Sequence, residues 1–111
     1  MDTLDRYRQI IEKALTEYAA IPYKYGEIES QVIVSKDFNT FLIITQGWEA
    51  KKRVHGCLIH IDIIDDKIWI QRDGTEDGIT LDLVDAGIPK DKIVLGFHPP
   101  EIRQHTGYAV A

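Results

Sequence analysis

Hydrophobic residues at the start of the chain recur every three or four positions, which is the period of an α-helix. Charged residues such as Arg8, Glu12 and Glu17 fall largely elsewhere on the helical wheel, as expected for a helix that packs one face on a core. The apolar stripe consists of Leu4, Tyr7, Ile11, Leu15 and Tyr18. Because Pro22 disfavours a helical conformation at the preceding residue, the pattern predicts a helix over residues 3–20.

Four runs with the character of β-strands follow the predicted helix. They cover residues 28–35, 40–45, 54–64 and 67–72. Their short connections favour antiparallel pairing between neighbours. Asp65 and Asp66 are expected to form a tight hairpin turn. Residues 46–53, with the sequence QGWEAKKR, are expected to form a longer loop between the second and third runs.

The third run has two faces of different character, because successive side chains of a strand point to opposite sides. The face expected to lie on the core beneath the helix carries Cys57, Ile59, Ile61 and Ile63. The opposite face is mixed and carries Leu58, His60, Asp62 and Ile64. If Ile68 and Ile70 of the fourth run enter the core, Trp69 stands on the mixed face beside His60 and Asp62.

The strand alternation stops after residue 73. Thr75 is a suitable N-cap for a helix, and Gly87, Ile88 and Pro89 form a strong stop signal after it. The stretch KIVLGF predicts a short fifth strand or an extended segment, and Pro100 can begin a last helical turn. The fold class is therefore α+β. We expect one domain over residues 1–111, with a single antiparallel sheet of about four strands, the N-terminal helix on one face, and short helices at the C-terminal end.

Composition and charge restrict the classes of protein to which this chain can belong. The chain has 111 residues and a formal net charge of −5, which argues against a stand-alone DNA-binding protein because phosphate neutralisation supplies most non-specific affinity. Direct DNA contact through the one basic run, Lys51-Lys52-Arg53, is kept as an alternative. A single cysteine, Cys57, cannot form an internal disulfide and favours a reducing, cytoplasmic location. No apolar run approaches the length of a membrane span, so we expect no membrane association.

Two groups of residues carry candidate chemistry. His60 and Asp62 lie two positions apart and share a strand face, so they suit two metal ligands or a base with its orienting acid. His98, Glu101 and His105 could form a second metal site on a helical turn. A polar sheet face and an ordinary turn explain both groups more simply. No glycine-rich nucleotide-binding motif or G-x-S-x-G is present, so we expect no cofactor and assign no catalytic residue.

Three stretches closely resemble the XisI family, the fdxN element excision controlling factor proteins. They are GCLIHIDIIDDKIWIQRDGTEDGI, LVDAGIPKDKIVLGFHPP and the terminal GYAVA. The N-terminal YRQIIEKALTEYA is also similar, so the resemblance covers essentially the whole chain. It implies a small cytoplasmic α+β protein that is usually encoded beside a XisH partner, which looks nuclease-like. It further implies a role in controlling the programmed, site-specific excision of a DNA element, with a different protein acting as the recombinase.

The sequence therefore favours a non-enzymatic binding module that pairs with a XisH-like protein and reaches DNA only through that complex. A partner surface is expected on the mixed sheet face and the C-terminal segment, because tryptophan is enriched in interface hot spots. Its residues are His60, Asp62, Trp69 and Arg72, with His98 and Tyr108 nearby. A homo-oligomer, and a metal-dependent nuclease or hydrolase that uses the His and Asp residues, stay open as alternatives.

Overall fold

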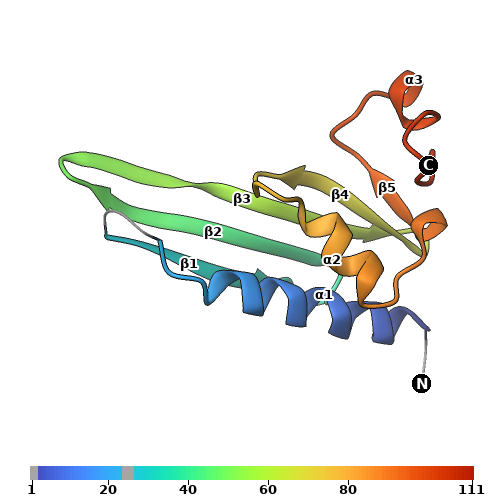
Figure 1. The fold of residues 1–111 in the computed structure, drawn as a ribbon. Helices are drawn as coiled ribbons and strands as arrows, with labels where there is room; N and C mark the ends of the chain where they lie inside the picture. Colours follow the sequence, from blue (N-terminus) through green and yellow to red (C-terminus); the bar gives the residue numbers. More distant parts are fainter. Residues whose placement is uncertain (1–2, 24–26) are drawn as a thin grey trace.

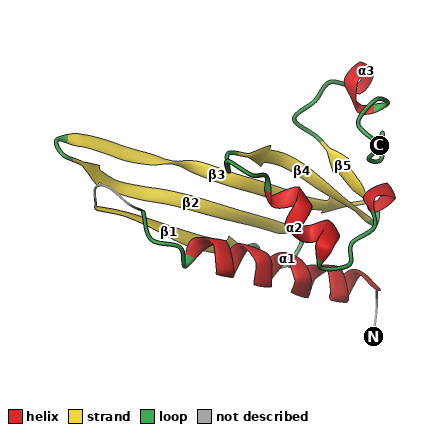
Figure 2. Ribbon diagram, in the orientation of Figure 1, coloured by secondary structure: helices red, strands yellow, loops and turns green. Residues whose placement is uncertain are grey.

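A five-stranded sheet with two helices on one face forms the body of the computed structural model, which describes residues 3–23 and 27–111 (Figures 1 and 2). The helices are α1 (Thr3–Ala19), α2 (Ile79–Asp85) and the short α3 (Pro100–Arg103). The strands are β1 (Glu27–Val34), β2 (Thr40–Glu49), β3 (Lys52–Ile64), β4 (Lys67–Asp73) and β5 (Ile93–Leu95). Within the described ranges, no helix is long and apolar enough to cross a membrane.

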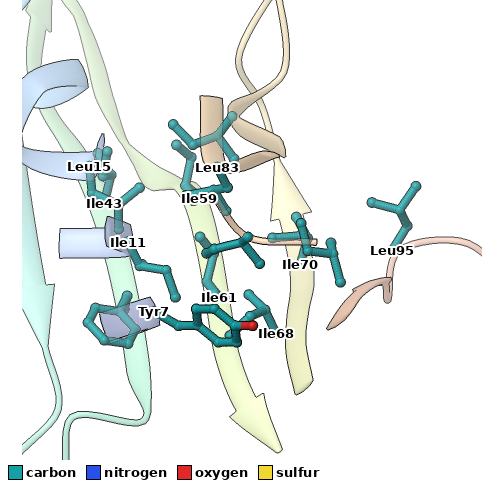
Figure 3. Packing of buried hydrophobic residues seen from close by; sticks show 14 residues of the cluster. Tyr7, Ile11, Leu15, Ile43, Ile59, Ile61, Ile68, Ile70, Leu83 and Leu95 are labelled. Atoms are coloured by element: carbon teal, nitrogen blue, oxygen red, sulfur yellow. The ribbon is translucent and has the colours of Figure 1, made fainter. Parts of the chain in front are cut away.

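Helix α1 confirms the prediction from the apolar stripe. Tyr7, Ile11 and Leu15 are buried, and the helix ends at Ala19, ahead of Pro22. Figure 3 shows these three side chains directed at isoleucines of β2, β3 and β4, with Leu83 of α2 in the same cluster. The core therefore lies between the sheet and the α1–α2 layer.

The sheet has the strand order β1-β2-β3-β4-β5. Strands β1 to β4 form an antiparallel meander, as the short connections predicted. Strand β5, however, pairs with β4 in parallel, through Ile68↔Ile93 and Ile70↔Leu95. The expected antiparallel sheet of about four strands is thus a mixed sheet of five. The reason is the connection through α2, which carries the chain back to the start of β4 and so makes the next strand parallel.

The hairpin between β2 and β3 corrects the expected loop at residues 46–53. Pairing continues to Glu49↔Lys52, and only Ala50 and Lys51 form the turn. Polar residues such as Gln46 point away from the helices, where water or a partner can contact them, so polarity here reflects an uncovered sheet face. The predicted turn at Asp65 and Asp66 is confirmed.

A β-bulge in β3 corrects the expected position of Cys57. Ile43 pairs with Ile59, whereas Ile44 pairs with Cys57, so Leu58 is an extra residue in β3. A bulge of this kind shifts the alternation of side chains by one position. Leu58 consequently packs against the core, and Cys57 lies on the opposite face with Ile44.

Helix α2 begins later than Thr75, the predicted N-cap. Its N-cap residue is Gly78, and Thr75 lies in the preceding loop, where its Oγ1 accepts a hydrogen bond from the Gly78 N–H at 3.0 Å. The predicted stop signal is confirmed. The N–H groups of Gly87 and Ile88 donate to the carbonyls of Val84 and Leu83, which is the Schellman arrangement.

Candidate functional site

One face of the sheet is turned away from α1 and α2, and we call it the open face (Figure 1). The strand register, with the contact of Gln71 to Asp62, places residues of β1 to β4 on it. They include Glu27, Glu29, Gln31, Ile33, Thr40, Leu42, Ile44, Gln46, Trp48, Arg53, His55, Cys57, His60, Asp62, Ile64, Lys67, Trp69, Gln71 and Arg72. Four of the six residues predicted for a partner surface belong to this set.

The predicted pair of His60 and Asp62 forms the centre of a polar network on the open face. The His60 Nε2 lies 3.2 Å from the Asp62 carboxylate. The Thr40 hydroxyl and the Gln71 side-chain amide also donate to this carboxylate, at 2.8 and 3.3 Å. Because donors from β2, β3 and β4 share one carboxylate, the network links three strands and orients the imidazole. Neighbouring side chains thus already occupy the Asp62 carboxylate, as expected on a polar sheet face.

Trp69 stands on the open face, as predicted, because Ile68 and Ile70 are fully buried on the other side. Its neighbour across the strand pair is Asp62. The guanidinium carbon of Arg103 lies 5.1 Å from the centre of the indole ring, within the range of a cation–π contact. Trp69 is therefore half-buried beneath the last residue of α3, and it is not a freely projecting anchor.

The C-terminal segment, which we define as residues 96–111, is fastened to the edge of the sheet. Ala109 donates its N–H to the Ile93 carbonyl at 2.9 Å and forms a parallel bridge with Val94. Val94 is fully buried yet lies outside the cluster under the helices. The segment thus covers the part of the open face that belongs to β5.

His98 and Tyr108, the other two predicted residues, lie in this segment. The His98 carbonyl accepts a hydrogen bond from the Arg103 Nε at 2.9 Å, and its ring lies 4.6 Å from the Phe97 ring, centre to centre. The Lys90 ammonium lies 5.7 Å from the centre of the Tyr108 ring. Since Arg103 contacts both His98 and Trp69, it connects the segment with the β4 part of the open face.

The remaining candidate residues, those of the second predicted metal site and of the basic run, form no site with the residues described above. Within residues 3–23 and 27–111, no three His, Cys, Asp or Glu side chains gather as metal ligands do, so His98, Glu101 and His105 form no such group. Lys51, Lys52 and Arg53 are exposed at the tip of the β2–β3 hairpin, at the end of the sheet opposite to α3 (Figure 1).

Sequence reasoning missed the β1–β2 half of the open face. Trp48 and Ile33 remain 49% and 41% exposed there, and Leu42 and Ile44 lie half-buried between them. Assigning residues 46–53 to a loop hid this region. A strand alternation that continued from Leu42 through Ile44 and Gln46 to Trp48 was the available signal.

A cavity of about 500 Å³ lies between the end of α1 and the start of α2. Tyr18, Tyr23, Glu76, Asp77 and Asp82 are among its lining residues. Burial raises the pKa of Tyr18, and nearby Tyr23 and acidic groups raise it further. The cavity is therefore an acidic hollow on the side of the molecule remote from the open face.

Comparisons with known proteins match one family over almost the whole chain. The family model described as XisI protein matches residues 1–110. The crystal structure of a XisI-like protein from Anabaena variabilis is 37% identical, with a TM-score of 0.88 over 98% of this chain and 100% of that one. The structure of the fdxN element excision controlling factor XisI from the same organism is 32% identical, with a TM-score of 0.82 over 99% and 100%. A search of curated proteins finds no match.

Proposed function

Because the chain belongs to the XisI family, we propose that it is a XisI-like controlling factor for the programmed, site-specific excision of a DNA element. It acts in the cytoplasm by binding another protein and carries out no bond-making or bond-breaking step itself. The proposed partner is a XisH-like, nuclease-related protein. A similar structure that is named as the fdxN element excision controlling factor XisI supports this role.

The observation that carries the binding role is the continuity between the open face and the C-terminal segment. Arg103 contacts Trp69 on β4 and the His98 carbonyl within the segment, so two regions distant in sequence form one surface. We call it the Trp69 surface, and it comprises His60, Asp62, Trp69, Arg72, His98, Arg103 and Tyr108. Tryptophan and arginine are both enriched at the centres of protein interfaces.

The state of the polar groups supports binding over catalysis. The carboxylate of Asp62 accepts hydrogen bonds from Thr40 and Gln71 and contacts His60, so its lone pairs are directed at neighbouring side chains. A rigid, satisfied polar network costs little to bury in an interface. The net charge of −5 also favours a basic, DNA-handling partner, because complementary charge speeds association.

The test is complex formation with a XisH-like protein, the proposed partner. The two proteins are co-expressed, purified through a tag on one of them, and their affinity is measured by calorimetry. Arg72 is the best position to change, because its side chain is exposed and donates only to the Cys57 carbonyl among the contacts described. Reversal of this charge by Arg72→Glu is expected to weaken the complex by about tenfold or more while leaving the melting temperature unchanged.

The matched control is Lys13→Glu, the same charge reversal on α1, which lies on the opposite face of the sheet. This variant is expected to bind like the original protein. Equal affinity for the Arg72 and Lys13 variants would remove the Trp69 surface as the partner site. Absence of any complex between the two unmodified proteins would refute the binding role itself.

A further inference from the structure

The β1–β3 part of the open face carries an ordered charge pattern that the proposed function does not use. The strand register sets its residues in rows that run across β1, β2 and β3. One row is Glu27–Trp48–Arg53 and the next is Glu29–Gln46–His55. Each row thus begins with a carboxylate on β1 and ends with a basic side chain on β3.

The middle of this region is apolar. Trp48, Ile44 and Leu42 lie along β2 on the open face, with Gln46 between Trp48 and Ile44, and Ile33 of β1 pairs with Leu42. Trp48 and Ile33 are 49% and 41% exposed, so they are large apolar side chains that the chain itself leaves in water. We define the β2 strip as these four apolar residues with their flanks, Glu27, Glu29, Arg53 and His55.

The C-terminal segment does not cover the β2 strip. That segment is attached to β5 through Ala109, whereas the β2 strip lies on the first three strands at the other edge (Figure 1). The guanidinium carbon of Arg53 lies 5.3 Å from the centre of the Trp48 ring. This contact fixes the basic flank beside the aromatic residue.

A two-fold rotation about a line along β2 exchanges the acidic and basic flanks and keeps the apolar centre in place. When two open faces are stacked around that axis, β1 of one copy faces β3 of the other. Glu27 then faces the Arg53 position of the second copy, Glu29 faces the His55 position, and the Trp48 side chains meet. Sheets commonly pack in this way, with aligned strands about 10 Å apart.

From this self-complementary pattern we propose that the β2 strip is a homodimer interface whose occupant is the β2 strip of a second copy of this chain. A two-fold interface must be complementary to itself, and the two charged rows of the strip meet that condition. Trp69, Arg72 and the C-terminal segment lie on β4 and beyond, outside this interface, and stay available for a different partner, whereas His60, which pairs with Leu42, borders the interface. Homodimerisation and binding of a XisH-like protein are therefore separable properties.

The first measurement is the molar mass of the full chain by light scattering and sedimentation equilibrium, from micromolar to near-millimolar concentration. The expected mass is twice the 12.7 kDa of one copy. Ile44→Glu, which places two carboxylates at the centre of the interface, is expected to lower the mass to that of a monomer. Lys13→Glu on α1 is the control variant and should stay dimeric.

The decisive measurement is the dimer dissociation constant of variants in which one charge of the proposed Glu27–Arg53 pair is reversed. Glu27→Arg and Arg53→Glu are each expected to raise the dimer dissociation constant by about tenfold or more, because like charges then face each other twice. An equimolar mixture of these two variants is expected to regain the dimer, since both of its charge pairs are again opposite. Within one chain Glu27 and Arg53 lie two strands apart, about 10 Å, so a change inside the monomer does not reproduce this rescue.

Several outcomes overturn the proposal. A monomer at every concentration refutes it, as does a dimer that resists Ile44→Glu or a variant mixture that stays monomeric. If the strip variants remove binding of the XisH-like protein to a monomeric chain, the strip belongs to that partner instead. Should either Arg/Glu variant fail to fold by circular dichroism, Glu29→Lys and His55→Glu repeat the same exchange in the next row.

Discussion

At the scale of single residues, Asp73 is an unexpected organiser of the molecule. Its carboxylate accepts hydrogen bonds from the Thr75 N–H and hydroxyl, and its Oδ2 accepts from the Ile79 N–H at 2.8 Å. Gly78, the N-cap residue of α2, has no side chain that could perform this function. Asp73, at the end of β4, therefore replaces a conventional helix cap and ties the sheet to the first turn of α2.

Replacement of this carboxylate should loosen the start of α2. Asp73→Ala leaves the Ile79 N–H without its acceptor and is expected to lower the free energy of unfolding by about 1–2 kcal/mol. Asp73→Asn keeps one acceptor oxygen and should cost less. Urea denaturation measures both, with Asp77→Ala, an exposed residue of the same loop, as the control. An alanine variant as stable as the original would show that the cap contributes nothing.

At the scale of elements, local signals in the sequence predicted helix α1 and the turns better than they predicted the pairing and register of the strands. The stripe of α1, the Asp65–Asp66 turn and the Gly87 stop signal depend on short-range geometry, so a single sequence reveals them. The parallel pairing of β5 depends on where α2 returns the chain, and the bulge at Leu58 depends on packing. Neither leaves a clear mark in the local pattern.

The Asp65–Asp66 turn offers a test of this local geometry. Both residues have positive φ angles, 50° and 66°, which suit a type I′ turn, and glycine adopts such angles more readily than aspartate because it has no Cβ. Asp66→Gly is expected to raise the free energy of unfolding by about 0.5–1 kcal/mol.

Lys36→Gly is the matched control for this turn. Lys36 lies in the β1–β2 turn and is not among the positive-φ residues, so glycine there should be neutral or destabilising. Thermal melting of both variants measures the difference. The interpretation of the Asp65–Asp66 geometry is wrong if Asp66→Gly lowers the melting temperature as Lys36→Gly does.

At the scale of the whole molecule, the sequence predicted which residues share the candidate surface but not which of them contact one another. Strand alternation alone placed His60, Asp62 and Trp69 on one face. The contact of Arg103 with Trp69 joins residues that are 34 positions apart, and no pattern in the sequence marks it. Separation of the open face into the Trp69 surface and the β2 strip likewise requires the register of all the strands.

The C-terminal segment should therefore behave as part of the same cooperative unit as the sheet. Truncation after Thr106 removes the Ala109 N–H bond to Ile93 and uncovers Val94, which is fully buried. The lost hydrogen bond, the exposure of Val94 and the lost packing of Tyr108 against the core are together expected to lower the free energy of unfolding by about 2–4 kcal/mol. Urea denaturation followed by Trp69 fluorescence in a Trp48→Phe background measures this loss. Val110→Ser is the control, because Val110 is 55% exposed; unchanged stability after truncation would mean that the segment is only loosely attached to β5.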